Sequence, residues 1–181
     1  MLGQQNDRAL VQAAMAGDKA AYGRLYDRYA PLVRAVCYDR TGNLADAQDL
    51  AQDVFLRAYQ RLEQIRDPER FGAWIVQAAR YRCGEWRRGK SRQRRRDAER
   101  AKAAAATTTS SEGIRPDELR AKIAKLPEKE RLALHVFYLN GQSADEACRI
   151  VGLSRSGFYQ TLSRARAQLR KQLDPELENT L

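Results

Sequence analysis

The sequence predicts an all-α protein made of two small helical domains joined by a basic linker. Apolar residues recur at helical spacing along most of the 181-residue chain, and Pro and Gly are sparse. The apolar–polar alternation of period two that is typical of strands does not occur. Between Arg87 and Arg115 the composition becomes basic, then Ala-rich, then Thr/Ser-rich, with almost nothing to bury. That stretch is therefore expected to be a linker.

Four helices are expected in the N-terminal half, because each apolar stripe there follows a residue that can cap a helix. They run from Asn6 or Asp7 to Ala16, from Asp18 to about Arg40 with Pro31 inside the helix, from about Ala45 to Ile65, and from Glu69 to about Arg88.

The stretch from Ser143 to Leu169 is typical of a helix-turn-helix, whose second helix enters a DNA major groove. Apolar positions flank Gly152, which can end a helix in the left-handed conformation, and Ser154 can cap the next one. An ordinary helical hairpin with a solvated basic face is the alternative. The side chains that the second helix offers to DNA are Arg155, Ser156, Tyr159, Gln160, Ser163, Arg164 and Arg166, together with Ser154 at its start.

The fourth expected helix interleaves cations with aromatic residues towards its C-terminal end. This pattern favours single-stranded nucleic acid, because arginines bind phosphate while aromatic rings stack on unpaired bases. The competing interpretation is that Trp74 belongs to the core and that Trp86 is a capping aromatic.

The third expected helix carries three acids, Asp46, Asp49 and Asp53, towards its N-terminal end, where the helix dipole favours anions. A solvated, capped surface explains these acids. It explains Phe55 less well if that ring lies off the apolar stripe.

The formal net charge is +10, from 33 Lys and Arg against 23 Asp and Glu, which predicts an anionic partner such as nucleic acid or a membrane surface. No apolar run is long enough to span a bilayer and the first residues do not resemble a signal peptide, so a cytoplasmic protein is expected. Cys37, Cys83 and Cys148 are expected to be buried small hydrophobic residues. His135 is expected to be structural or exposed.

No metal or cofactor is expected, and neither is an enzyme. The sequence offers no nucleophile–base–acid set, no metal-ligand spacing and no phosphate-cradling glycine loop, which argues against a hydrolase.

Several segments together resemble the sigma-70 family of RNA polymerase sigma factors, in its extracytoplasmic-function (ECF) group. The resemblance rests on GDKAAYGRLYDRYAPLVRAV, DAQDLAQDVFLRAY and FGAWIVQAARYRCGEWRR in the first half, and on LPEKERLALHVFYLNGQSADEACRIVGLSRSGFYQTLSRARAQLRKQL in the second. It implies a region 2-like domain over 1–90, a linker over 91–115 and a region 4-like domain over 116–175.

The resemblance also implies partners and roles. The partners would be promoter DNA, core RNA polymerase through its β′ clamp helices and its β subunit, and an anti-sigma factor; membrane insertion is not expected. The 154–166 helix would read the −35 element. The core polymerase would contact Asp46, Asp49, Leu50, Gln52, Asp53 and Phe55, and the melted −10 element would contact Arg66, Arg70, Trp74, Arg80, Tyr81, Trp86 and Arg87.

Two other functions compete with this interpretation. A stand-alone helix-turn-helix regulator would need a dimer interface and a palindromic site, and it leaves the acidic and the aromatic helices unexplained. An anti-sigma-like or scaffold protein would act through protein contacts alone, so loss of Arg164 and Arg166 would leave its function intact.

Overall fold

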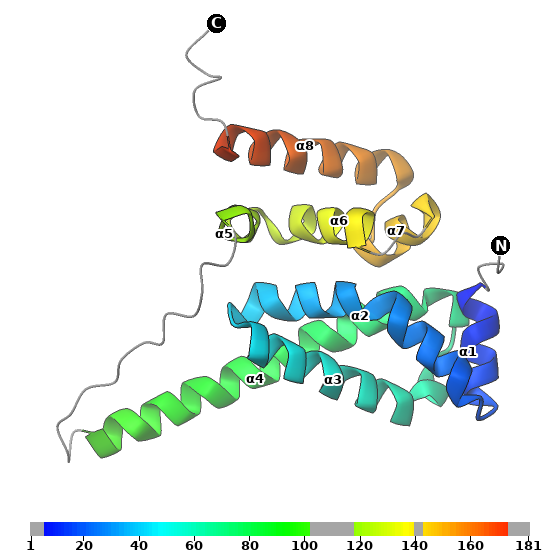
Figure 1. Cartoon of the computed structure of the whole chain (residues 1–181), viewed down its shortest axis with the longest axis horizontal. Coiled ribbons are helices and arrows are strands. Elements are labelled where there is room, and N and C mark those ends of the chain that lie inside the picture. Colours follow the sequence, from blue (N-terminus) through cyan, green and yellow to red (C-terminus); the bar gives the residue numbers. More distant parts are fainter. Residues whose placement is uncertain (1–5, 102–117, 140–142, 174–181) are drawn as a thin grey trace, which may run out of the picture.

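The computed structural model describes residues 6–101, 118–139 and 143–173, and within these ranges the chain forms α-helices and two short 3-10 helices, with no strand (Figure 1). None of the helices in these ranges is long and apolar enough to span a membrane. The elements are α1 (Asp7–Met15), α2 (Lys19–Thr41), α3 (Leu44–Gln60), η1 (Leu62–Gln64), η2 (Pro68–Arg70), α4 (Phe71–Ala101), α5 (Glu118–Ala124), α6 (Glu128–Leu139), α7 (Ala144–Val151) and α8 (Arg155–Leu173).

The predicted caps of the N-terminal helices are confirmed. The Asn6 side chain accepts a hydrogen bond from the Arg8 amide, and Asp18 accepts from the first amides of α2. Gly42 ends α2 in the left-handed conformation with φ of +65°. These contacts satisfy amides that a helix end otherwise leaves free, which fixes where each helix begins.

Helix α2 lies at the centre of the N-terminal bundle and packs on α1, α3 and α4. Its apolar stripe is buried, and Tyr29 packs its ring on Phe71 of α4 at a centroid distance of 5.3 Å. Burying a large apolar side chain of this kind contributes about 1.5–3 kcal/mol. Other fully buried members of this core are Leu10, Val11, Leu25, Leu32, Val33, Val54 and Ile75.

Two helix ends differ from the prediction. Helix α3 stops at Gln60 instead of continuing to Ile65, and the short η1 follows. This turn buries Leu62 and Ile65 in the core. Helix α4 continues to Ala101, well past Arg88, because the stretch after Arg88 lacks Pro and is rich in helix-forming Arg, Gln and Ala. The sequence also predicts a turn at Asn140-Gly141 and the end of the last helix at Asp174-Pro175. Both positions, like 102–117, lie outside the described residues.

The C-terminal domain confirms the predicted helix-turn-helix. Gly152 adopts φ of +73° and ends α7, and the Leu153 amide donates to the Cys148 carbonyl. Ser154 caps α8 through the Gly157 amide at 3.2 Å. The domain core is formed by Leu126, Leu132, Ala133, Val136, Ile150, Phe158, Leu162 and Ala165.

The two domains pack directly against each other, which the sequence did not predict. Helix α6 lies along α2, and α7 lies against the start of α4 (Figure 1). Asp39 of α2 binds Arg131 of α6 at 2.9 Å, and Glu128 accepts from both Arg40 and Arg80.

Gly72 of α4 lies tightly against Tyr29 of α2 and Glu146 of α7, and a substitution there tests this packing. A Cβ atom at this position would lie 2.8 Å from the Tyr29 ring and 2.9 Å from Glu146 Oε1. We expect Gly72→Ala to lower the free energy of unfolding by about 1–3 kcal/mol through overpacking. Denaturant unfolding followed by circular dichroism measures the change.

Gly84→Ala is the matched control, because it lies in the same helix and its added Cβ would meet only the end of the Arg88 side chain at 3.7 Å. This variant should gain about 0.5–1 kcal/mol from the loss of glycine flexibility. Equal effects of the two substitutions would contradict the packing.

Candidate nucleic-acid and polymerase interfaces

A groove of about 440 Å³ lies between α3 and α4 and combines aromatic rings with arginines. Trp74 and Tyr81 line it from α4, and Tyr81 is 62% exposed. Arg57 and Arg61 line it from α3. Flat rings beside cations can hold an unpaired base by stacking while the cations bind the phosphate backbone.

Arg82 is fixed at the edge of this groove by two carboxylates. Its guanidinium donates to Asp53 Oδ2 at 2.5 Å and to Glu85. Asp53 also accepts two hydrogen bonds from Arg57, at 2.9 and 3.0 Å. Burial opposes ionisation of Asp53, but the hydrogen bonds from Arg57 and Arg82 outweigh it and lower the pKa of this carboxyl. Asp53 therefore orders two arginines of the groove.

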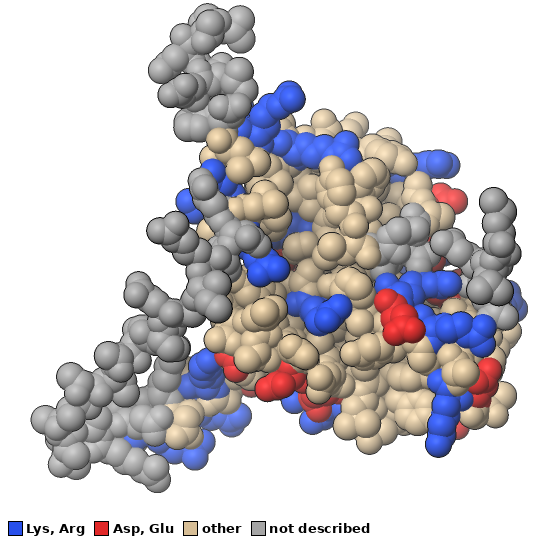
Figure 2. Space-filling view, in the orientation of Figure 1, with Lys and Arg blue, Asp and Glu red and all other residues tan. Residues whose placement is uncertain are grey.

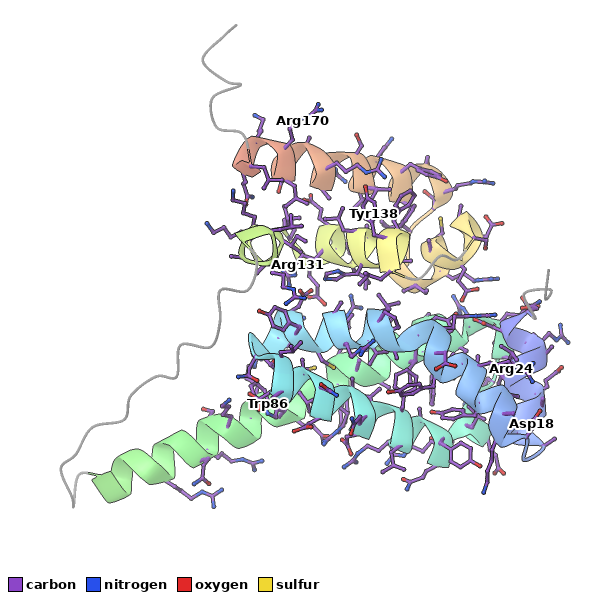
Figure 3. The ribbon with its side chains drawn as sticks, viewed as in Figure 1. Asp18, Arg24, Trp86, Arg131, Tyr138 and Arg170 are labelled. Carbon is purple, nitrogen blue, oxygen red and sulfur yellow. The ribbon has the colours of Figure 1, made fainter. Side chains whose placement is uncertain are left out.

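The structure brings together only part of the predicted −10 set. Trp74 and Tyr81 share the groove, whereas Arg66, Arg70 and Arg87 are exposed outside its lining. Two further members are already engaged, since Arg80 binds Glu128 of the C-terminal domain and Trp86 lies under the Lys90 ammonium at 4.5 Å. Figure 3 shows Trp86 beside the start of α3.

Sequence reasoning missed several groove residues, namely Arg57, Arg61, Gln64, Gln77 and Arg82. A signal was present: Arg57 and Arg61 stand four residues apart on α3, as do Gln77 and Tyr81 on α4, so each pair shares a helix face.

Helix α8 presents its polar side to solvent, as predicted for a recognition helix. Figure 2 shows basic side chains along this helix. The Arg166 side chain points towards α6, where its guanidinium lies over the Phe137 ring at 4.8 Å and over the Tyr138 ring at 5.5 Å. The predicted contacts Ser154, Arg155, Ser156, Tyr159, Gln160, Ser163, Arg164 and Arg166 are all exposed.

The outer face of α3 holds only some of the predicted polymerase contacts. Asp49 and Gln52 are exposed, whereas Leu50 and Phe55 are buried in the core at 6% and 3% exposure. Asp46 binds Lys90 at 3.1 Å, and Asp53 turns to the groove arginines. Figure 2 shows acidic side chains gathered where α3 begins and crosses α4.

A shallow apolar hollow of about 400 Å³ lies beside Gln52 and was not predicted. Leu56 and Tyr59 line it from α3, and Tyr22 and Tyr26 line it from α2. Leu56 is 59% exposed. Residues 49, 52, 56 and 59 follow one another at helical spacing, which is the signal that could have extended the predicted surface beyond its acids.

The histidine and the three cysteines lie outside the groove and outside the exposed faces of α3 and α8. His135 faces Asp39 at 3.3 Å, and Cys37 and Cys83 are buried while Cys148 is half-buried. Among the described residues, no three His, Cys, Asp or Glu side chains lie close enough together to hold a metal ion.

Comparison with known proteins identifies both parts of the chain. The Sigma-70 region 2 model matches residues 25–93, and the Sigma-70 region 4 model matches residues 117–169. The ECF sigma factor EcfG of Rhodopseudomonas palustris is 30% identical over 77% of this chain and 77% of that protein. SigW of Bacillus subtilis is 27% identical over 90% of this chain and 94% of that protein.

A probable sigma factor of Xanthomonas campestris, RfaY, is 33% identical over 88% of this chain, which spans only 42% of that longer protein. Two solved structures share the fold. CnrH in complex with the cytosolic domain of CnrY has a TM-score of 0.63 and 24% identity, covering 95% of this chain and 99% of CnrH. RpoE bound to the anti-sigma factor NepR from Bartonella quintana has a TM-score of 0.54 and 20% identity, covering 86% and 98%.

The two helical domains, with a helix-turn-helix in the second, define a transcription initiation factor of the sigma type. The chain belongs to the sigma-70 family and, within it, to the ECF group. It is an ECF-type sigma factor, and the stand-alone regulator considered from the sequence is not favoured.

The Asp53 contacts predict an acid-dependent contribution to stability. Because the pKa of Asp53 is lowered in the folded chain, its contribution is present above the ordinary aspartate pKa of about 3.9 and is lost as pH falls further. We expect Asp53→Asn to lower the free energy of unfolding at pH 7 by less than about 1 kcal/mol, since the site is partly exposed.

Urea unfolding at pH 7 and pH 3 measures this effect, and the difference from the natural chain should shrink at pH 3. Asp49→Asn, an exposed neighbour on the same helix, is the control and should change neither curve. A pH-independent loss in Asp53→Asn would contradict the ion-pair account.

Proposed function

We propose that this ECF sigma factor uses three separate surfaces and catalyses no reaction itself. The region 2-like domain over 1–90 binds core polymerase and the −10 element, and the region 4-like domain over 116–175 binds the −35 element. The basic segment 91–115 joins the two and adds salt-dependent affinity for phosphate. Since polymerase and chromosomal DNA are its partners, we place the protein in the cytoplasm.

The α3/α4 groove captures unpaired bases of the −10 element. The observation that supports this role is the placement of Trp74 and Tyr81 between arginines from two helices. A base that leaves the duplex loses its stacking, and an aromatic face can replace it, so capture favours the melted strand. Melting then follows from binding and needs no chemical step.

Helix α8 reads the −35 element in the major groove. Its exposed side carries Arg155, Gln160 and Arg164, which include the side chains that recognise guanine and adenine edges. Arg166, held against Phe137, is suited to a phosphate contact at the edge of the interface.

The outer face of α3 binds the polymerase clamp helices. Asp49 and Gln52 are available there, and Leu56 adds apolar area next to them. Leu50 and Phe55 contribute by holding the helix in place from the core. We also propose an anti-sigma factor as a partner, because both related folds were solved in complexes, one of them with a named anti-sigma factor.

The −10 role is tested by removing the exposed ring of the groove. We expect Tyr81→Ala to weaken binding of a single-stranded −10 oligonucleotide by about 10- to 100-fold, because base–aromatic stacking contributes about 1–3 kcal/mol. Fluorescence anisotropy of the labelled oligonucleotide measures the affinity. Tyr138→Ala, which removes an equally exposed ring from the C-terminal domain, should leave it unchanged.

The polymerase role is tested by reversing one charge. Asp49→Arg should weaken binding to core polymerase at least about tenfold, because a cation would face the cations expected on the clamp. Asp27→Arg, an exposed reversal on α2, is the control. Co-purification and in-vitro transcription with core enzyme measure both, and unchanged polymerase affinity in Asp49→Arg would overturn the assignment.

A further inference from the structure

The two domains meet at a buried cluster of oxygen atoms. Glu146, in the first turn of α7, lies within hydrogen-bond distance of the Tyr29 hydroxyl of α2, with Oε1 at 2.6 Å from that oxygen. The same hydroxyl also contacts Asp7 of α1. Asp7 and Glu146 are only 2% and 7% exposed, and the absence of a side chain at Gly72 leaves room for the Tyr29 hydroxyl and Glu146 Oε1.

The contact among Asp7, Tyr29 and Glu146 needs one more proton than is present when both carboxyl groups are ionised. A carboxylate, a hydroxyl and a second carboxylate stand in a row, and two hydrogen bonds join them. The Tyr29 hydroxyl has a single hydrogen and can donate to one carboxylate only. The second hydrogen bond therefore requires a proton on the other carboxyl group. Without that proton, two buried oxygen atoms would face each other with no hydrogen between them, which is unfavourable.

The surrounding charges place that proton on Glu146. Arg28 of α2 forms an ion pair with Asp7, which compensates the negative charge on that side. Glu146 has a weaker partner in Arg149 of its own helix, at 3.6 Å, and Arg149 is shared with Glu69 of η2 at 3.7 Å. The Asp7 carboxylate then accepts from Tyr29, and the Glu146 carboxyl donates to it.

Ion pairs also join the two domains. Asp39 binds Arg131 and faces His135, and Glu128 binds Arg40 and Arg80. Figure 3 shows Arg131 between α6 and α2. Glu128 and its two arginine partners are 30–44% exposed, so each pair adds little by itself. Glu146 is thus the buried centre of the interface.

The packed arrangement conflicts with the proposed function. Elements named −35 and −10 lie roughly 25 base pairs apart, about 85 Å of duplex at 3.4 Å a step. A compact unit of the described size is only about 40 Å across. The packed chain can hold one element at a time, and its −10 candidate Arg80 is occupied by Glu128.

We propose that the Asp7–Tyr29–Glu146 contact is a proton-linked latch that keeps the free sigma factor closed until its domains separate on the polymerase. The closed form takes up one proton at Glu146, and opening releases it. The inhibitory part of this proposal rests on the proposed function; the latch itself does not.

The sign of the pH dependence follows from the same geometry. Burial, together with the nearby Asp7, raises the pKa of Glu146 to about 7 in the closed form. In the open form Glu146 returns to the ordinary range near 4.3. Closing is therefore favoured as pH falls from about 7 towards the ordinary value, and its equilibrium constant should fall about tenfold from pH 6 to pH 8.

Single-molecule energy transfer on the full chain tests the latch without polymerase or DNA. Dyes at positions 24 and 170, exposed on the two domains, report closed and open populations. A fixed low urea concentration keeps both populations measurable. The natural chain should show the tenfold change, whereas Glu146→Gln should stay closed at both pH values, because an amide can donate to Tyr29 as the protonated acid does.

Two further variants complete the test. Asp145→Asn, an exposed acid in the same turn of α7, should behave like the natural chain. His135→Gln tests the other titratable group of the interface. The proposal is overturned if the closed population is independent of pH, or if the pH dependence persists in Glu146→Gln and disappears in His135→Gln. A failure to direct transcription would count against the proposed function and leave this result unaffected.

Discussion

Tyr29 is the residue on which both the core and the domain arrangement depend. Its ring is fully buried against Phe71 in the centre of the N-terminal bundle, and its hydroxyl reaches the surface that receives α7. A phenylalanine could fill the same space but could not join Asp7 to Glu146. The side chain therefore connects the packing of one domain to the position of the other.

Helices α3 and α4 each present residues for different contacts on different faces. On α3, Asp53 orders two arginines of the groove, while the exposed Asp49 and Gln52 stay available to a partner. On α4, one face carries core residues such as Phe71, Ile75 and Ala79, while Trp74 and Tyr81 line the groove from the same turns. A small chain can serve polymerase and promoter at once because helical periodicity presents different residues on different faces.

The helices and the helix-turn-helix could be predicted from the sequence because local signals determine them. Asp18 and Asn6 cap helices through contacts within three residues, and Gly152 ends α7 through its own backbone conformation. The sites were harder to predict, because a residue type does not reveal its partner. Asp53 and Arg80 looked available in the sequence, yet each is engaged by a residue far away along the chain, and Trp86 is covered by Lys90 one helical turn later. The interdomain contact had no local signal at all, since Tyr29 and Glu146 are 117 positions apart.

Helix α4 also acts as a rigid spacer. It runs without interruption from the core through the groove and on to Ala101, and it projects beyond the bundle (Figure 1). At 1.5 Å per residue, the thirteen steps after Arg88 carry the chain roughly 20 Å outwards. The end of α4 thus sets the direction in which the chain leaves the first domain. Because this part of the helix is stiff and rich in arginine, it would meet an anionic surface along its axis at a defined angle.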